Sequence, residues 1–293
     1  VEIPDTLLAK SNPRVKAWRA RAPLVPIEKR VEDAEMAAAL GVFSNSALVD
    51  FYGQVTDSDD TAAASGTPAD MLRTAYSASE PSERLTAMRT LWSGDALDPV
   101  LKYSRLILTA RAAARITPSD SFESDLGSII GSMMSAGFDI QAARWSKIVS
   151  GAGGDSGKQA WGLLAVGAPG QVVDWSRSRV ESFQGSGDDG DRRGRFLFAG
   201  MAGLGRMNAS DAQGMAQSLS IPIAKSSAWT RALDRAVAAR EPGTVALLCA
   251  LGLSGNDWRA VSPEQLYHVI AALNAVGLAP EARMIAAEAI SRT

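Results

Sequence analysis

Residues 126–144 read LGSIIGSMMSAGFDIQAAR, and residues 266–284 read LYHVIAALNAVGLAPEARM. Six positions correspond across a separation of 140 residues: Ile129, Ile130, Met133, Gly137, Phe138 and Ala142 match Val269, Ile270, Leu273, Gly277, Leu278 and Ala282. In each copy, apolar residues at helical spacing lead to a glycine and an apolar residue. A small alanine then follows, at the point where a second helix would cross the first. Each copy therefore predicts a helical hairpin.

The rest of the chain also predicts helices and no strands. From Glu28 onward, apolar residues recur with a period of about 3.6, and period-two alternation is lacking. Thr67, Asp98 and Ser262 each precede a proline, as N-caps before a first-turn proline do, and Gln265 would complete a capping box with Ser262. The expected helices span 28–40, 44–53, 68–78, 81–92, 98–115, 121–136, 139–150, 157–166, 169–180, 191–205, 209–219, 226–240, 242–252, 262–276 and 279–291.

These helices predict an all-α fold. We expect an α-solenoid or a curved superhelical stack of about 14 to 15 antiparallel helices with an extended N-terminal arm. The arm would span residues 1–30 and the helical repeat domain residues 31–293, with a subdomain hinge near 185–190. The hairpins resemble the tetratricopeptide-like class of α-solenoids. This resemblance implies a partner-binding scaffold at the level of architecture, and it carries over no functional residue.

Four prolines in residues 1–30 favour an irregular arm with short helical pieces, so we expect a tether that contributes nothing to a core. The arm holds seven cations and three acids, whereas the next thirty residues hold seven acids and no cation. This asymmetry predicts that the arm docks onto the acidic segment, either within one chain or on a second copy. Trp18 is flanked by Arg19 and Arg21, which suits insertion into a groove in cis or on a partner. These three are the candidate partner-binding residues.

Composition excludes several function classes. The formal net charge of −2 provides no attraction to nucleic acid, and no apolar run is long enough to cross a bilayer. The chain begins at Val1 without a methionine, so we expect that a signal peptide or another domain precedes it, which favours export over the cytoplasm. The expected partner is thus another protein or a second copy, bound through the arm or the helical surface.

Reactive side chains are scarce. Cys249 is the only cysteine and lies in an apolar stretch, so we interpret it as a core residue. His268 is the only histidine, which excludes sites that need two; a structural or surface role is expected. Six of the seven tryptophans lie in or beside expected helices and should fill the core, Trp18 being the exception. We predict no catalytic residue, cofactor or metal.

Several local motifs have simpler interpretations. Gly154-Asp-Ser-Gly157 is similar to the serine segment of trypsin-like proteases, but those are β proteins. Residues 152–159 approach a phosphate-binding loop without its first glycine or its Ser/Thr, so we expect a flexible linker between helices. The acidic stretches 57–60 and 188–191 lack the ligand spacing of an EF-hand, so we interpret them as loops.

The leading hypothesis is a noncatalytic helical-repeat scaffold for protein-protein interaction or assembly. The alternative is a helical enzyme that cleaves cell-wall glycans. It rests on Glu181-Ser182, which resembles the Glu-Ser opening of soluble lytic transglycosylases, enzymes that use a single glutamate as acid and base. A third possibility, binding of a small ligand within a helical ring, requires an apolar pocket.

Overall fold

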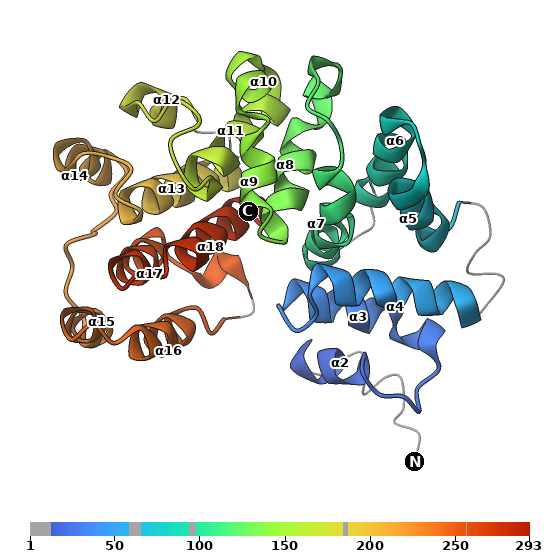
Figure 1. Cartoon of the computed structure of the whole chain (residues 1–293). Helices are drawn as coiled ribbons and strands as arrows, with labels where there is room; N and C mark the ends of the chain where they lie inside the picture. Colours follow the sequence, from blue (N-terminus) through green and yellow to red (C-terminus); the bar gives the residue numbers. More distant parts are fainter. Residues whose placement is uncertain (1–12, 59–65, 94–97, 184–186, 256) are drawn as a thin grey trace. The chain divides into compact units, whose positions relative to one another are not determined.

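The computed structural model describes residues 13–58, 66–93, 98–183, 187–255 and 257–293 (Figure 1). Helices account for 73% of the described residues, which contain seventeen α-helices and no strand. The all-α prediction is confirmed. The expected number of helices was too low for two reasons: residues 13–19 of the arm are helical, and the helix expected at 139–150 is divided into two.

The chain divides into two compact units, which are described separately: an N-terminal unit, Val1–Thr117, and a C-terminal unit, Pro118–Thr293. The N-terminal unit contains α2 (Pro13–Arg19), η1 (Ile27–Arg30), α3 (Val31–Ala39), α4 (Asn45–Ser58), α5 (Pro68–Ser77), α6 (Pro81–Trp92) and α7 (Pro99–Ala114). The C-terminal unit contains η2 (Asp120–Asp125), α8 (Leu126–Ser135), α9 (Asp139–Ala143), α10 (Ser146–Gly151), α11 (Gly154–Gly167), α12 (Arg177–Glu181), α13 (Gly187–Gly203), α14 (Ala209–Ser218), α15 (Ala228–Ala238), α16 (Pro242–Gly252), η3 (Trp258–Ala260), α17 (Pro263–Ala275) and α18 (Ala279–Ser291).

Helix α7 is the centre of the N-terminal unit, and it packs against α3, α4, α5 and α6. Each of these helices also makes a polar contact with it. Asn45 of α4 and Tyr76 of α5 donate hydrogen bonds to the carbonyl of Leu108, at 3.4 and 3.0 Å. Trp92 of α6 donates to Thr109 at 2.9 Å. The fourth contact, from α3, is an ion pair described below.

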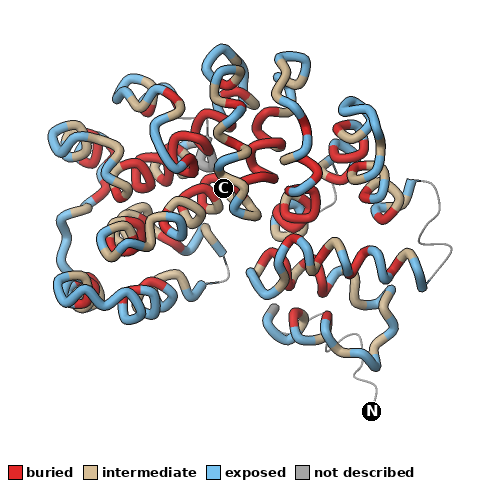
Figure 2. Tube along the Cα trace, in the orientation of Figure 1, coloured by how far each residue is buried: buried red, intermediate tan, exposed pale blue. Residues whose placement is uncertain are grey.

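The core of the C-terminal unit is formed by α8, α11, α13, α17 and α18, and the buried residues follow these helices (Figure 2). Gly203 lies where α13 crosses α17: a Cβ added there would be 2.9 Å from Ile270 Cγ2. Helix α18, at the end of the unit, packs on α8 near its beginning. The helices of this unit are therefore not packed only on their sequence neighbours, as they would be in a simple linear stack.

The two copies of the repeated pattern have the same geometry. Gly137 and Gly277 have φ values of +75° and +87°, which glycine adopts without strain. In both copies the next residue donates a hydrogen bond of 2.9 Å to the carbonyl five positions earlier, from Phe138 to Met133 and from Leu278 to Leu273. This is the Schellman helix ending, and the predicted hairpin turns are confirmed.

The same helix ending occurs at four further places that the sequence comparison did not identify. The residues with positive φ are Gly41 (+73°), Gly205 (+67°), Ser220 (+55°) and Arg240 (+56°). After each, the next amide bonds to the carbonyl five residues earlier, at 2.8 to 3.0 Å. At two of the four the residue is not glycine, so a search for glycine-apolar pairs misses them.

Several sequence predictions of local structure were wrong. The helix expected at 169–180 forms only at Arg177–Glu181, because the Asp174 carboxylate accepts bonds from the amide and hydroxyl of Ser176 and sets the helix start after it. The helix expected at 139–150 is interrupted at Arg144 and Trp145, where tight turns bring the Trp145 ring into the core. The expected linker 152–159 is helical from Gly154, the first residue of α11.

The polar loops fall partly outside the described residues. Asp57 lies in the last turn of α4, while residues 59 and 60 are outside the description. Of the hinge expected at 185–190, residues 185 and 186 are also outside it. Helix α13 begins at Gly187, four residues earlier than the predicted start at 191, so the interpretation of the acidic stretch 188–191 as a loop was wrong. The three predicted N-caps, Thr67, Asp98 and Ser262, are confirmed by their hydrogen bonds.

Candidate functional site

Helix α2 is anchored to α3 on one side. Ala17 and Ala20 are fully buried, so the expectation that the arm contributes nothing to a core is wrong for these residues. On the same side Lys16 pairs with Glu32 at 3.5 Å, and Arg19 pairs with the buried Asp33. These ion pairs confirm that the arm docks onto its own acidic segment, the first of the two predicted alternatives. A seven-residue helix is not stable alone, so these contacts hold it in place.

The other side of α2 exposes two large apolar side chains. Trp18 is 73% exposed, and Val15, one turn earlier, is 41% exposed. Leu24, shortly after the helix, is 97% exposed. These three and Val42 are the exposed large hydrophobic residues among the described part of the N-terminal unit. Trp18 therefore does not occupy a groove of its own chain, and the exposed apolar side chains of this unit are concentrated in residues 15–42.

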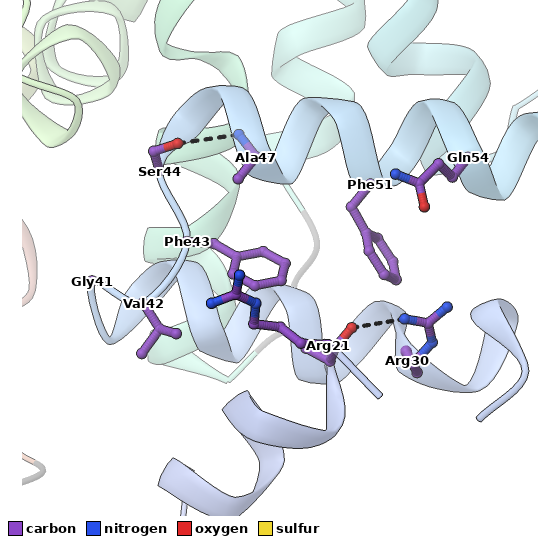
Figure 3. Close-up of a pocket in the computed structure, with 10 residues that line it drawn as sticks. Arg21, Arg30, Gly41, Val42, Phe43, Ser44, Ala47, Phe51 and Gln54 are labelled. Atoms are coloured by element: carbon purple, nitrogen blue, oxygen red, sulfur yellow. Dashed lines mark hydrogen bonds between the residues drawn. The ribbon is translucent and has the colours of Figure 1, made fainter. Parts of the chain in front are cut away.

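A pocket of about 600 Å³ lies between the end of α2, η1, the α3–α4 turn and α4 (Figure 3). Its apolar wall includes Phe43 and Phe51, and two arginines contribute its charge. In Figure 3 the side chain of Arg21 extends toward Phe43. Arg30 donates a hydrogen bond to the Ala20 carbonyl at 2.9 Å, and its guanidinium lies 5.5 Å from the centre of the Phe51 ring.

The structure assigns different surroundings to the three predicted partner-binding residues. Trp18 is exposed, Arg19 is used in the ion pair with Asp33, and Arg21 lines the pocket. Sequence reasoning missed Arg30 and the two phenylalanines of the pocket. Arg30 was counted as one of the cations of the arm, but no local signal placed it beside Phe51, twenty-one residues later.

Helix α3, which supports α2, is held by a buried charged cluster. Glu35 contacts Nε of Arg105 in α7 at 2.8 Å and accepts a 2.5 Å hydrogen bond from the Tyr52 hydroxyl of α4. Glu35 is 3% exposed and Arg105 is 8% exposed. Burial raises the pKa of Glu35 above its ordinary value, although Arg105 and Tyr52 act in the opposite direction. The cluster joins α3, α4 and α7, and its contacts form only when these helices are aligned so that Glu35, Tyr52 and Arg105 meet.

A second cavity, of about 660 Å³, lies between α15, α16 and α17 in the C-terminal unit. His268 lines it together with Glu264, the one carboxylate of the lining. The imidazole packs edge-on against Trp229, with ring centres 6.3 Å apart, and its buried Nε2 has no hydrogen-bond partner among the described residues. Burial lowers the pKa of His268, while Glu264 and Asp234 raise it.

The other candidate residues are apart from both cavities. Cys249 is buried, and burial raises the pKa of its thiol to about 11. The Ser156 hydroxyl accepts a hydrogen bond from the Gly127 amide at 3.0 Å, and so joins α11 to α8. Glu181 is exposed at the end of α12, where it pairs with Arg177 at 2.7 Å.

Metal-ligating side chains do not cluster in the described ranges: no group of three or more His, Cys, Asp or Glu is placed to hold an ion. In the same part of the chain, no helix combines the length and apolarity that crossing a bilayer requires.

Comparison with known proteins found no match to this chain among family models, curated proteins or solved structures.

Proposed function

We propose that the chain is a noncatalytic helical scaffold whose N-terminal unit binds another protein chain, a second copy included, against the exposed side of α2. The observation that carries this proposal is the contrast between the two sides of that helix. Its inner side is fixed by two buried alanines and two ion pairs, whereas its outer side exposes Trp18 and Val15. Tryptophan on a rigid support is the typical anchor of a protein interface.

The recurrence of one helix ending in both units agrees with a scaffold built from repeated helical hairpins. The scarcity of reactive groups agrees with a binding role. His268 lines its cavity with one carboxylate, and Glu181 pairs with Arg177 on an exposed surface. We therefore place the partner-binding site on a surface of the N-terminal unit.

Photo-crosslinking from position 18 tests the proposal. Trp18 is replaced by p-benzoylphenylalanine, and the matched control carries the same residue at Ile140, which is similarly exposed at 68%. We expect a discrete protein adduct from position 18, either a dimer of the purified chain or a defined partner in the source cells, and none from position 140. Equal adducts from both positions, or none from position 18 in either setting, would contradict the proposal.

Light scattering on point variants complements this experiment. Deletion of the whole arm is unsuitable, because it would leave the buried Asp33 without its partner Arg19. Trp18→Ala removes only an exposed ring. If the partner is a second copy, the mass of the assembly should fall toward that of the monomer in Trp18→Ala and stay unchanged in Ile140→Ala.

A further inference from the structure

We propose that the pocket lined by Arg21 and Arg30 binds a carboxylate of an acidic, apolar segment of a partner protein. This proposal rests on the proposed function, since it names the chemistry of the chain that would be bound. Three observations support it: the pocket, the lack of a carboxylate partner for its two arginines among the described residues, and the apolar wall beside them.

The charges of this pocket are not neutralised by any acid among the described residues. Neither Arg21 nor Arg30 has a carboxylate partner among the described residues, and the pocket lining contains no acid. By contrast Arg19, Arg105 and Arg283, which are partly or largely buried, pair with Asp33, Glu35 and Asp139.

Arg30 is held in a fixed position. One of its terminal nitrogens donates a hydrogen bond to the Ala20 carbonyl, and its Cζ lies over the Phe51 ring. Its buried Nε has no hydrogen-bond partner in the described parts of the chain. Such a guanidinium loses little conformational freedom when an anion binds. Arg21 is exposed at the edge of the pocket and extends toward Phe43, so it can close over a bound anion (Figure 3).

The occupant is best described as a short acidic peptide. Guanidinium groups bind carboxylates through paired hydrogen bonds, and Phe43, Phe51 and Val42 provide contact for a neighbouring apolar side chain. An extended polyanion is disfavoured, since the arm's cations Lys16 and Arg19 are already paired with Glu32 and Asp33 and the whole chain has a net charge of −2. A nucleic acid or an anionic membrane would need a broad basic surface.

Calorimetric titration of the full chain with two blocked octapeptides tests the proposal. One alternates glutamate and leucine, and the other alternates glutamine and leucine. We expect the glutamate peptide to bind with a dissociation constant below about 1 mM and the glutamine peptide to bind at least about tenfold more weakly. Binding of the glutamate peptide should weaken as salt is raised, because the contact is charged.

Three variants distinguish binding in the pocket from a general effect of the charge of the chain. Arg21→Glu should weaken binding of the glutamate peptide by about tenfold or more, and Arg21→Lys should have a smaller effect because it keeps the charge. Lys29→Glu is the matched control: this exposed residue precedes Arg30 in sequence, lies outside the pocket lining and undergoes the same charge change. It should bind like the unmodified chain. Circular dichroism should show the same helix content in all variants.

Equal binding of the two peptides, equal loss in Arg21→Glu and Lys29→Glu, or tighter binding of phosphatidylserine vesicles or inorganic phosphate than of the glutamate peptide would overturn the proposal. These outcomes are distinguishable from failure of the proposed function. Crosslinking at position 18 reports on the outer side of α2 and does not depend on Arg21. A positive adduct with no peptide binding would reject the pocket alone.

Discussion

The cores of the two units differ in chemistry. Six of the eight buried polar or charged residues among the described parts lie in the N-terminal unit: Asp33, Glu35, Asn45, Ser104, Arg105 and Thr109. The described core of the C-terminal unit buries only Ser132 and Thr230 of this kind. Its helices instead approach closely at glycines such as Gly162, Gly200 and Gly203, where an added Cβ would contact a neighbouring side chain.

This difference indicates two ways of specifying a helical packing. Apolar close packing depends on shape, and helices joined in this way tolerate exchange of apolar residues of similar volume. Buried ion pairs and hydrogen bonds contribute less net stability, but a wrong register leaves charges unpaired. In the N-terminal unit, the contacts of Glu35 with Arg105 and Tyr52 hold α3 in position. Helix α3 in turn holds α2, which carries the exposed Trp18. The predictions below test the comparison in order of expected effect.

The largest effect is expected from Glu35→Ala. It leaves Arg105 buried without its partner, which should lower the free energy of unfolding by about 3 to 5 kcal/mol. Chemical denaturation measures this loss. The double variant Glu35→Leu, Arg105→Met removes both charges and should regain most of the stability. If the double variant is as unstable as the single one, the cluster stabilises by packing and the proposed contrast between the cores is wrong.

Gly203→Val tests the other core. The added side chain would meet Ile270 and the carbonyl oxygen of Tyr267, both within about 3 Å of a Cβ at this position, and should cost about 2 to 3 kcal/mol. Gly243→Val is the matched control, since a Cβ there has open space. Denaturation midpoints compare the two variants. Equal stability of both would show that the α13–α17 crossing is not closely packed.

The helix endings predict effects of opposite sign. Gly277→Ala forces a φ of +87° on alanine and should cost about 1 kcal/mol, whereas Gly170→Ala, at a residue without positive φ, should change little. Arg240→Gly should stabilise by about 0.5 kcal/mol, because arginine there already has a φ of +56°. Thermal unfolding measures all three. A loss of stability in Arg240→Gly would contradict the backbone explanation.

The smallest effect concerns His268. Its pKa should lie below the ordinary value of 6.5, because burial disfavours the charged imidazole. The unfolded chain then binds the proton more tightly, so the contribution of His268 to stability is complete above pH 6.5 and is lost as the pH falls through the folded-state pKa.

Proton NMR reports this titration directly, since the chain has one histidine. Glu264→Gln should lower the pKa further, because Glu264 raises it in the unmodified chain. A pKa at or above 6.5 would show that burial does not outweigh the attraction of Glu264 and Asp234 for the charged imidazole.

The sequence predicted the local features of the fold better than the long-range ones. The hairpin turns at Gly137 and Gly277 and the cap at Ser262 depend on neighbouring residues, so their patterns were sufficient. The interruption at Trp145 could not be predicted, because it arises from burial of a ring against other helices.

For the candidate site too, the sequence predicted local features but not long-range contacts. Trp18 and Arg21 were identified from the composition of the arm. Whether each arginine has an acidic partner depends on tertiary contacts, and residues 31–60 offer seven acids to choose from. The structure was therefore needed to show that Arg19 pairs with Asp33 and that Arg21 has no acidic partner among the described residues.

Hydrogen exchange in α2 tests most directly the claim that the charged core fixes the helix that presents Trp18. The measurement compares the unmodified chain with Asp33→Ala, which removes the buried partner of Arg19, and with Asp50→Ala, an exposed acid of α4. We predict that amides of residues 17–20 exchange at least about tenfold faster in Asp33→Ala and at the unmodified rate in Asp50→Ala. Unchanged exchange of these amides in Asp33→Ala would contradict the account.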